Sequence, residues 1–462
     1  MPFRARGGSE LRVARALTIA GSDSGGGAGI QADLKTFAAL RVHGMSAVTA
    51  ITAQNTTGVG AIQEVDPKVV KAQIEAVVED IGVDAAKTGM LYSSGIINVV
   101  AKEVEEHGFP VVVDPVMVAK SGAPLLKKDA VKALAERLIP LATVVTPNAM
   151  EAEALSSVKV ESLEDAKESA KEIAKLGAAA VVVKGGHVDT GNKVYDILYH
   201  GGKFEIYEGD RLPAKSTHGT GCVFSSAIAA ELAKGKSIEE AVREAKTFVS
   251  NAIRFGLPLG KGVGPVDPTA SLHNEAEKYE VLMVVKEAVK ILEKNPKVAY
   301  LIPESQSNIG MALRYPSSAA DVAAVPGRVV KLRDGVKASA HPEFGASRHV
   351  ANTILTAMRH DPAVRSAMNI RYSKELVELC RSLGMAVSFY DRRLEPPDVK
   401  EKEGMTTVWG TEEAIKKIGR VPDVIYHEGD YGKEPMIVVL GKDAVKVARK
   451  VVKLSEHVCP SG

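Results

Sequence analysis

Cysteine is scarce in this chain, which has 462 residues and only three cysteines. Cys222, Cys380 and Cys459 are too few and too widely spaced for a disulfide framework or a cysteine-rich zinc site. Disulfide-stabilised secreted domains are therefore excluded. The pattern is typical of a reducing compartment, and we expect a cytoplasmic protein.

Long apolar runs and a dominant charge are also absent. No run of about 18 apolar residues occurs, so we expect no transmembrane helix and no membrane partner. The formal net charge of +2 gives no reason to expect nucleic acid as a partner. Arginines near the N-terminus are not followed by an apolar segment, which argues against a signal peptide. We expect residues 1–15 to form a disordered basic arm.

The composition that remains is that of a globular protein with more than one core. Hydrophobic residues make up 45% of the chain. At roughly 150 residues per domain, the length suggests two or three domains. Glycine and proline cluster between Gly256 and Pro268, which predicts a domain boundary within 267–274. We therefore expect one domain over 16–268 and another over 275–456.

Strand-like and helix-like segments alternate through the first domain. The strands are apolar throughout, which predicts an α/β fold with a mostly parallel sheet covered on both faces. Ligands bind such sheets at the carboxyl ends of the strands. The predicted strands are 16–20, 47–53, 85–88, 111–114, 143–146 and 180–184, and the predicted helices are 30–40, 68–80, 94–106, 130–138, 163–175 and 223–233.

The second domain begins with an amphipathic helix over 275–294. Its expected apolar face consists of Tyr279, Leu282, Val285, Val289 and Leu292. Further strands are predicted at 298–302, 386–390, 424–426 and 436–440. A last helix over 443–454 carries a Lys/Arg face, which we interpret as solvated.

The turn from Ser216 to Cys222 places two glycines, Gly219 and Gly221, around Thr220 at the start of the helix over 223–233. Backbone N–H groups at such a helix start form an anion site, which phosphoryl transfer needs. Cys222 lies at the same helix end, where a thiol is expected to have a lowered pKa and could act as a base or nucleophile. A small cysteine that merely packs in a tight turn is the alternative.

Two common phosphate-binding motifs fit this sequence poorly. The Walker pattern fails because no Gly-Lys-Ser/Thr closes the first glycine-rich stretch. The dinucleotide pattern matches in Gly27-Ala28-Gly29-Ile30-Gln31-Ala32, but the acidic ribose ligand expected about 20 residues later is missing. Both glycine-rich stretches together need another explanation.

Taken together, several motifs resemble the ribokinase superfamily, and within it the hydroxymethylpyrimidine/phosphomethylpyrimidine kinases of thiamine biosynthesis. The resemblance covers the first 250 or so residues. The matching stretches are 20–37, Ala53-Gln54-Asn55, Asp114-Pro115-Val116-Met117, Thr146-Pro147-Asn148, Lys184-Gly185-Gly186-His187 and His218-Gly219-Thr220-Gly221-Cys222. A ribokinase-like three-layer fold, ATP and Mg²⁺ are implied.

The resemblance also implies a role for each matching position. Substrate binding would fall to Asp33 and Gln54, and the Mg²⁺ region to Asp114 and Glu151. Asn148, Lys184 and Thr220 would lie at the nucleotide. Gly219, Gly221 and Cys222 would form the catalytic turn. Turn formation and capping are the structural alternative for Asp114 and Asn148. Pyridoxal kinase is a close competitor that physical reasoning alone does not exclude.

The second domain resembles the archaeal-type thiamine-phosphate synthase domain, which implies a second three-layer α/β unit. The match lies in stretches that begin at Pro303, Val325, Phe344, Met368 and Tyr390, and it implies active-site roles for Arg328 and His349. A similar domain occurs in thiamine-phosphate-sensing repressors, but no recognisable helix-turn-helix is present here.

We therefore interpret the chain as a bifunctional thiamine-biosynthesis enzyme. Its partners would be small molecules, namely the hydroxymethylpyrimidine, its phosphates and a thiazole phosphate. We also expect a homo-oligomer, although no sequence signal sets its size. A pyridoxal-type kinase joined to a non-catalytic sensing domain is the alternative.

Overall fold

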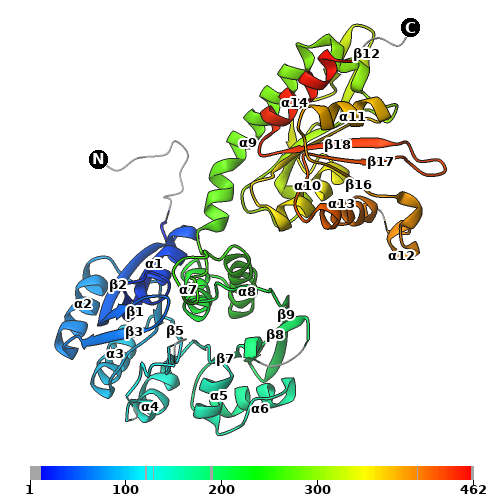
Figure 1. The fold of residues 1–462 in the computed structure, drawn as a ribbon. Helices are drawn as coiled ribbons and strands as arrows, with labels where there is room; N and C mark the ends of the chain where they lie inside the picture. Colours follow the sequence, from blue (N-terminus) through cyan, green and yellow to red (C-terminus); the bar gives the residue numbers. More distant parts are fainter. Residues whose placement is uncertain (1–11, 120–121, 128, 188–190, 403, 459–462) are drawn as a thin grey trace, which may run out of the picture. The chain divides into compact units, whose positions relative to one another are not determined.

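The computed structural model describes residues 12–119, 122–127, 129–187, 191–402 and 404–458. The chain divides into two compact units between Ser271 and Leu272 (Figure 1). Most of the arm expected over residues 1–15 and one cysteine, Cys459, lie outside the described residues. No helix in the described part of the chain is long and apolar enough to cross a membrane.

The first unit is built on a nine-stranded sheet in the order β3-β2-β1-β4-β5-β6-β7-β8-β9. The six central strands, β2, β1, β4, β5, β6 and β7, pair in parallel, as predicted. The remaining strands, β3 at one edge and β8 and β9 at the other, pair antiparallel. The strands are β1 (Arg15–Asp23), β2 (His43–Gln54), β3 (Val59–Glu64), β4 (Ala85–Thr88), β5 (Val111–Val113), β6 (Val144–Val145), β7 (Ala180–Val183), β8 (Lys193–His200) and β9 (Lys203–Asp210).

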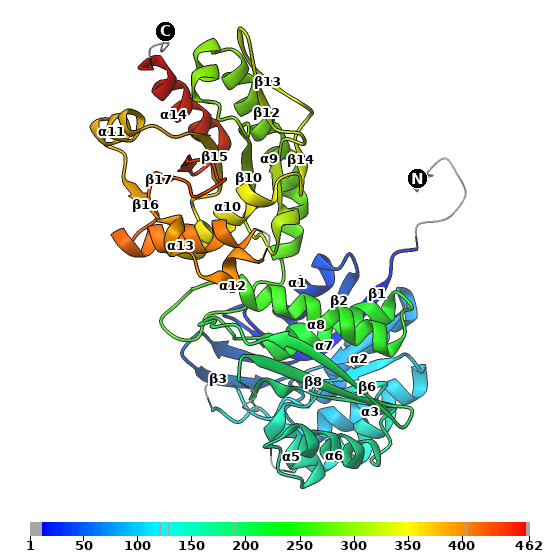
Figure 2. The ribbon, with the colours of Figure 1, turned by 90° about the vertical axis from the view of Figure 1, so that its right-hand side faces the viewer.

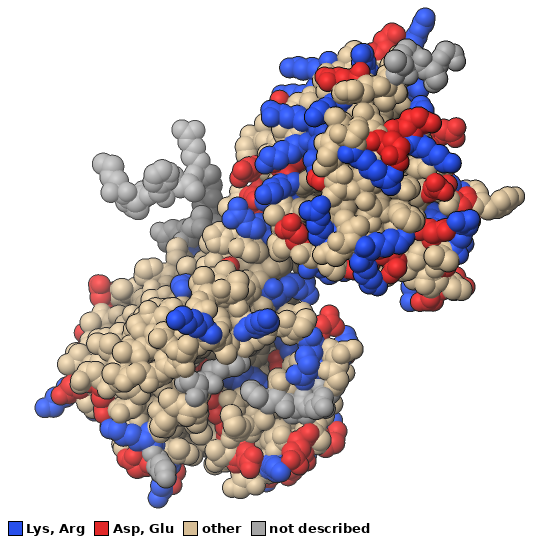
Figure 3. All heavy atoms as spheres, in the orientation of Figure 1, with Lys and Arg blue, Asp and Glu red and all other residues tan. Residues whose placement is uncertain are grey.

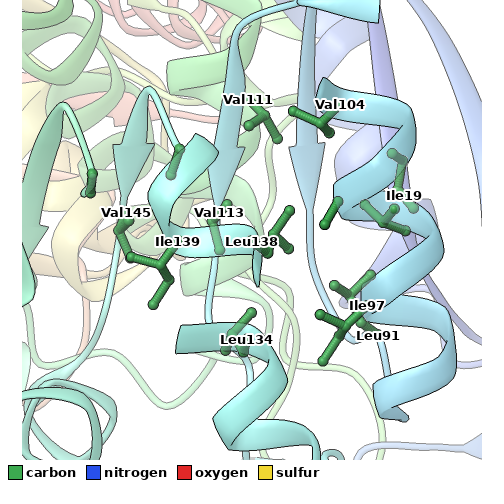
Figure 4. Packing of buried hydrophobic residues seen from close by; sticks show 14 of the residues in the cluster. Ile19, Leu91, Ile97, Val104, Val111, Val113, Leu134, Leu138, Ile139 and Val145 are labelled. Carbon is green, nitrogen blue, oxygen red and sulfur yellow. The ribbon is translucent and has the colours of Figure 1, made fainter. Parts of the chain in front are cut away.

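Helices cover both faces of this sheet, which explains the continuous apolar strands (Figure 2). Val111 and Val113 pack into the core beneath α2, α3 and α6, shown in Figure 4, whereas Val112 packs toward α7 and α8. The helices are α1 (Gly29–Ala39), α2 (Pro67–Asp80), α3 (Ser94–His107), α4 (Ala130–Ala133), η1 (Leu134–Leu138), η2 (Ile139–Leu141), α5 (Ala149–Ser156), α6 (Leu163–Ala174), η3 (Gly185–His187), α7 (Thr220–Ala233) and α8 (Ile238–Arg254).

The second unit has a seven-stranded sheet in the order β14-β11-β10-β15-β18-β17-β16, with one parallel pair, β16 and β17. A separate hairpin joins β12 (Val329–Leu332) to β13 (Gly335–Ala338). The sheet strands are β10 (Ile309–Ala312), β11 (Val322–Ala324), β14 (Glu343–Phe344), β15 (Ser366–Arg371), β16 (Val387–Phe389), β17 (Val424–His427) and β18 (Met436–Gly441).

Helices lie on both faces of the second sheet as well, which gives the expected α/β unit. One core includes side chains of α9, α11 and α14, and the other includes side chains of α10 and α13. On the face shown in Figure 3, acidic and basic side chains are interspersed over this unit. The helices are α9 (Ala270–Glu293), η4 (Pro296–Leu301), η5 (Ala319–Asp321), α10 (Arg348–His360), α11 (Lys374–Ser382), η6 (Arg392–Leu394), α12 (Pro397–Lys400), α13 (Met405–Ile418) and α14 (Ala444–Glu456).

Two predictions for the second unit are wrong. Residues 298–302 do not form a strand, because Pro296 occupies the first turn of the 3₁₀ helix η4, where its ring suits a helical start. On α9, Tyr279 is 74% exposed, and Val281 instead of Tyr279 belongs to the buried apolar face. Two residues along a helix turn the side chain by about 200°, so both cannot face one core.

Candidate active sites

The two glycine-rich stretches of the first unit pack directly against each other. Gly219 caps the N-terminus of α7 with φ +82°, a left-handed conformation that favours glycine. A Cβ atom added there would lie 1.8 Å from the carbonyl oxygen of Gly27. The Thr220 hydroxyl donates to the Thr217 carbonyl oxygen at 2.8 Å, which closes the turn. The start of α7 is therefore held against the loop before α1.

A lysine and two acidic residues lie beside this turn. Lys184 Nζ is 3.0 Å from Asp114 Oδ1, and a Cβ atom added to Gly221 would lie 3.2 Å from the same nitrogen. Burial raises the pKa of Glu151 to about 7. The positive charge of Lys184 opposes this shift, and the negative charge of Asp114 adds to it. Burial also opposes the charge of Lys184, but Asp114 and Glu151 outweigh it and raise the pKa of the lysine. The structure thus brings together the residues that directly follow β5 and β7 with residues of α5 and α7.

Asn148 performs the capping role that was its structural alternative. Its Oδ1 accepts from the Glu151 backbone N–H at 3.0 Å, and Glu151 Oε2 accepts from the Asn148 N–H at 2.8 Å. This capping box begins α5 and holds Glu151 next to Asp114. Asn148 is therefore a positioning residue for Glu151 in this structure.

Cys222 corrects one expectation. The helix N-terminus predicted a lowered pKa, but burial raises the pKa of the thiol to about 11. Lys87 opposes this shift, while Asp33 and Asp114 add to it by disfavouring a second negative charge. The expected stabilisation by the helix end is therefore outweighed, and the thiol is protonated at neutral pH.

Asp33 corrects a second expectation, because other side chains of the protein surround its carboxylate. It is fully buried and forms an ion pair with the equally buried Lys87 at 2.8 Å. The hydroxyls of Thr18 and Ser226 donate to its carboxylate at 2.6 Å each. All these contacts leave no place for a pyrimidine on this side chain. Asp33 instead anchors α1 to β4 and to α7.

Gln54 does line a pocket, with a volume of about 280 Å³, next to His218. His218 Nε2 is 3.3 Å from Gln54 Nε2 and 2.9 Å from Asp23 Oδ2. Burial tends to raise the pKa of Asp23, but hydrogen bonds from His218, Gly25 and Ala28 outweigh it and hold this pKa below its usual value. Sequence reasoning gave Asp23 and His218 no role, although each lies in one of the two glycine-rich stretches.

The second unit contains a larger pocket of about 720 Å³, and Arg328 and His349 both line it. His349 is the second residue of α10, and the Arg328 guanidinium donates to the carbonyl oxygen of Ser305. Arg328 has φ +76° and the neighbouring pocket residue Gln306 has φ +64°, conformations that are costly outside glycine. Arg392, in the matching stretch that begins at Tyr390, also lines this pocket, whereas sequence reasoning missed Lys400, Lys402, His427 and Lys433.

Comparison with known proteins assigns both units to families. Residues 23–267 match the phosphomethylpyrimidine kinase family, and residues 284–453 match the family of the thiamine-phosphate synthase ThiN. The bifunctional thiamine biosynthesis protein ThiDN of Methanocaldococcus jannaschii is 34% identical over 94% of this chain and 97% of its own length. The hydroxymethylpyrimidine/phosphomethylpyrimidine kinase of Bacillus subtilis is 47% identical over 57% of this chain and 98% of its own length.

Solved structures resemble the first unit. An ADP complex of Bacillus subtilis pyridoxal kinase is 44% identical, with a TM-score of 0.53, over 56% of this chain and 98% of that protein. The pyridoxal kinase of Staphylococcus aureus in complex with AMP-PCP and pyridoxal is 42% identical, with a TM-score of 0.52, over 56% of this chain and 94% of that protein. The chain belongs to the phosphomethylpyrimidine kinase family and carries, in the same polypeptide, a ThiN-type thiamine-phosphate synthase domain.

Proposed function

We propose that the protein is a bifunctional enzyme of thiamine biosynthesis. The first unit phosphorylates 4-amino-5-hydroxymethyl-2-methylpyrimidine to the monophosphate and then to the pyrophosphate. The second unit joins this pyrophosphate to a thiazole phosphate and releases pyrophosphate. The observation that carries the proposal is that the chain matches the two families one after the other and aligns over 94% of its length with the bifunctional M. jannaschii relative. Each matching unit has its own pocket.

The kinase reaction uses ATP, which the nucleotide complexes of the solved relatives support. The N-terminus of α7 stabilises the transferred phosphoryl group, and Lys184 next to Gly221 neutralises phosphate charge. Thr220 and Asn148 hold the phosphate-binding turn and Glu151 in place. Gln54 binds the aminopyrimidine in the pocket that it shares with His218.

The acidic residues beside Lys184 fit Mg²⁺ as partial ligands. No cluster of three or more His, Cys, Asp or Glu residues suited to a metal occurs within the described ranges. However, Mg²⁺ in kinases is commonly held by one or two carboxylates together with substrate phosphates and waters. Asp114 and Glu151 would hold the ion, which neutralises charge on the phosphates when bound.

A second candidate activity is pyridoxal phosphorylation. The observation in its favour is that the solved relatives named pyridoxal kinases are 42 to 44% identical to the first unit. Steady-state rates with pyridoxal and with the pyrimidine alcohol, measured at equal ATP, discriminate the two. We expect the pyrimidine alcohol to have the higher kcat/KM.

The coupling reaction needs a pocket that stabilises a departing pyrophosphate. The electron-rich aminopyrimidine ring can stabilise a carbocation at the carbon that carries the pyrophosphate, and the thiazole nitrogen then forms the new bond to that carbon. Arg328 holds the pyrophosphate oxygens, because its guanidinium forms paired hydrogen bonds with them. His349 donates a hydrogen bond or proton to the leaving group. Both side chains line the one pocket in which the departing charge develops.

The coupling proposal is tested with the full chain, the pyrimidine alcohol, ATP, Mg²⁺ and thiazole phosphate, and the products are identified by mass. Losing one charge-stabilising donor costs about 3 kcal/mol, or roughly a hundredfold in rate. We expect Arg328→Ala and His349→Ala each to slow thiamine-phosphate formation by that order while the pyrimidine pyrophosphate accumulates. Near-normal coupling in both variants would overturn these roles and favour a sensing domain.

A further inference from the structure

His427 lines the second pocket from a position that the roles above do not use. It ends β17 and is only 7% exposed. Side chains alternate along a strand, and Ile425 lines the same pocket while Val424 packs into the core on the other face. The imidazole is therefore held on the sheet face that forms the floor of the pocket.

The hydrogen bonds of His427 determine which ring nitrogen carries a proton. The backbone N–H of Gly429 donates to Nδ1 at 3.2 Å, so Nδ1 is the acceptor. Burial, together with the positive charge of Arg392, lowers the pKa of His427 to about 4, so the ring is neutral near pH 7. A neutral imidazole that accepts at Nδ1 carries its hydrogen on Nε2. Within the described ranges, the structure shows no hydrogen-bond partner for Nε2.

The surroundings of His427 favour a neutral ligand group. The ring centroid of Tyr390 is 5.0 Å from that of His427, and the rings of Tyr390 and Trp409 form a T-shaped pair. Ile425 and Val438 complete an aromatic and aliphatic part of the pocket wall. The exposed cations of the pocket, Arg328, Lys400, Lys402 and Lys433, are the groups suited to phosphates. Arg392, whose charge also acts on His427, is paired with Glu395 at 3.6 Å. A buried neutral donor beside aromatic and aliphatic side chains suits a neutral acceptor on a flat ring.

We infer that His427 is a specificity-determining residue of the coupling reaction, whose Nε2–H donates a hydrogen bond to a ring nitrogen of the aminopyrimidine substrate. The inference rests on the proposed synthase function of the second unit. It places the pyrimidine ring against Tyr390 and His427 and the pyrophosphate toward the cationic residues. His427 thereby selects a nitrogen heterocycle over a carbocyclic ring of the same shape.

The experiment uses two analogues of the pyrimidine pyrophosphate, in each of which one ring nitrogen is replaced by C–H. They carry a non-hydrolysable pyrophosphate and are measured as competitive inhibitors of thiamine-phosphate formation by the full chain, so that neither their own reactivity nor binding to the kinase unit affects the result. A parallel inhibitor carries the same non-hydrolysable pyrophosphate and retains both ring nitrogens. The variants are His427→Leu and His427→Gln, with His360→Leu as the control, because His360 is an exposed histidine that pairs with Glu412.

In the wild type and in His360→Leu, we expect one of the two analogues to have an inhibition constant at least about tenfold weaker than that of the parallel inhibitor, as the loss of one hydrogen bond implies. His427→Leu should bind all three inhibitors equally, whereas His427→Gln, which keeps an N–H donor, should still discriminate. Equal discrimination in the wild type and His427→Leu overturns the inference. The inference is also overturned if the wild type or His427→Gln binds all three inhibitors equally. This comparison does not need the leucine variant, so it tests the inference even if that variant does not fold. A wild type that forms no thiamine phosphate contradicts the proposed function instead.

Discussion

Cys222 is a protonated thiol at neutral pH, because burial raises its pKa to about 11. At pH values below this pKa, the fraction of Cys222 present as thiolate increases about tenfold for each pH unit. If the thiolate accepts the alcohol proton, the rate of the first phosphorylation rises between about pH 7 and 9. The second phosphorylation gains little, since a phosphate monoester with a second pKa of about 6 is already ionised.

We predict that Cys222→Ala and Cys222→Ser slow the first phosphorylation much more than the second and remove its rise with pH. Single-turnover rates for the pyrimidine alcohol and for its monophosphate, measured across this pH range, provide the check. Equal losses in both steps would indicate that Cys222 mainly shapes the phosphate-binding turn.

The buried pair of Asp33 and Lys87 predicts a stability effect and not a binding effect. Asp33→Ala leaves the lysine charge buried without its carboxylate, which typically costs about 3 to 5 kcal/mol. The double variant Asp33→Leu, Lys87→Met should recover most of this loss, because neither side chain is then charged. Urea unfolding measures both effects.

The control for this prediction is Glu161→Ala, which removes an exposed pair with Lys159 and should leave the unfolding midpoint close to that of the wild type. A normal unfolding midpoint for Asp33→Ala, combined with a raised KM for the pyrimidine alcohol, would contradict the structural role of Asp33 and restore its expected contact with the substrate.

At the scale of elements, the close packing of the α7 N-terminus against the first glycine-rich loop predicts that Gly219 cannot be replaced. An alanine there would need a left-handed φ and would collide with the Gly27 carbonyl oxygen. We expect Gly219→Ala to lose at least about tenfold in kinase kcat/KM, since a displaced turn no longer points its N–H groups at the phosphate. Coupling of supplied pyrimidine pyrophosphate should stay normal.

Gly235, just beyond the other end of α7, offers a matched control. Its φ is +85°, but a Cβ atom there would meet nothing within 4 Å. Gly235→Ala should therefore cost only about 1 kcal/mol of backbone strain, visible in thermal unfolding, with kinase kinetics unchanged. If both glycine variants behave alike, the packing contact at Gly219 does not matter for catalysis.

At the scale of the whole molecule, the two units have separate hydrophobic cores. Three core clusters contain buried residues no later than Val266, and two contain buried residues no earlier than Val281. A protein truncated after Pro268, before α9 begins, should therefore fold and carry out both phosphorylations at rates near those of the full chain. Thermal unfolding and kinase assays measure this, and an insoluble fragment beside a sound full chain would contradict it.

The sequence by itself determined most of the parallel sheet and the location of the glycine-rich turn that begins α7. Strands such as Ala180–Val183 could be predicted to within one residue, because a strand covered on both faces is usually apolar throughout. Gly219 in the turn was readable for a similar local reason, since a left-handed conformation at a helix start selects glycine. Arg328 and His349 were found through their motifs, and the structure places both at one pocket.

Only the tertiary structure decided what surrounds each charged or titratable group. Asp33 and Lys87 are 54 residues apart in the chain, and Asp23 and His218 are 195 residues apart, so no local pattern predicts that they pair. The pKa of Cys222 follows burial and charges contributed by other elements, which outweigh the local effect of its helix end. The physical reason is that glycine conformation and apolar periodicity are local properties, whereas burial and Coulomb interactions depend on residues that only folding brings together.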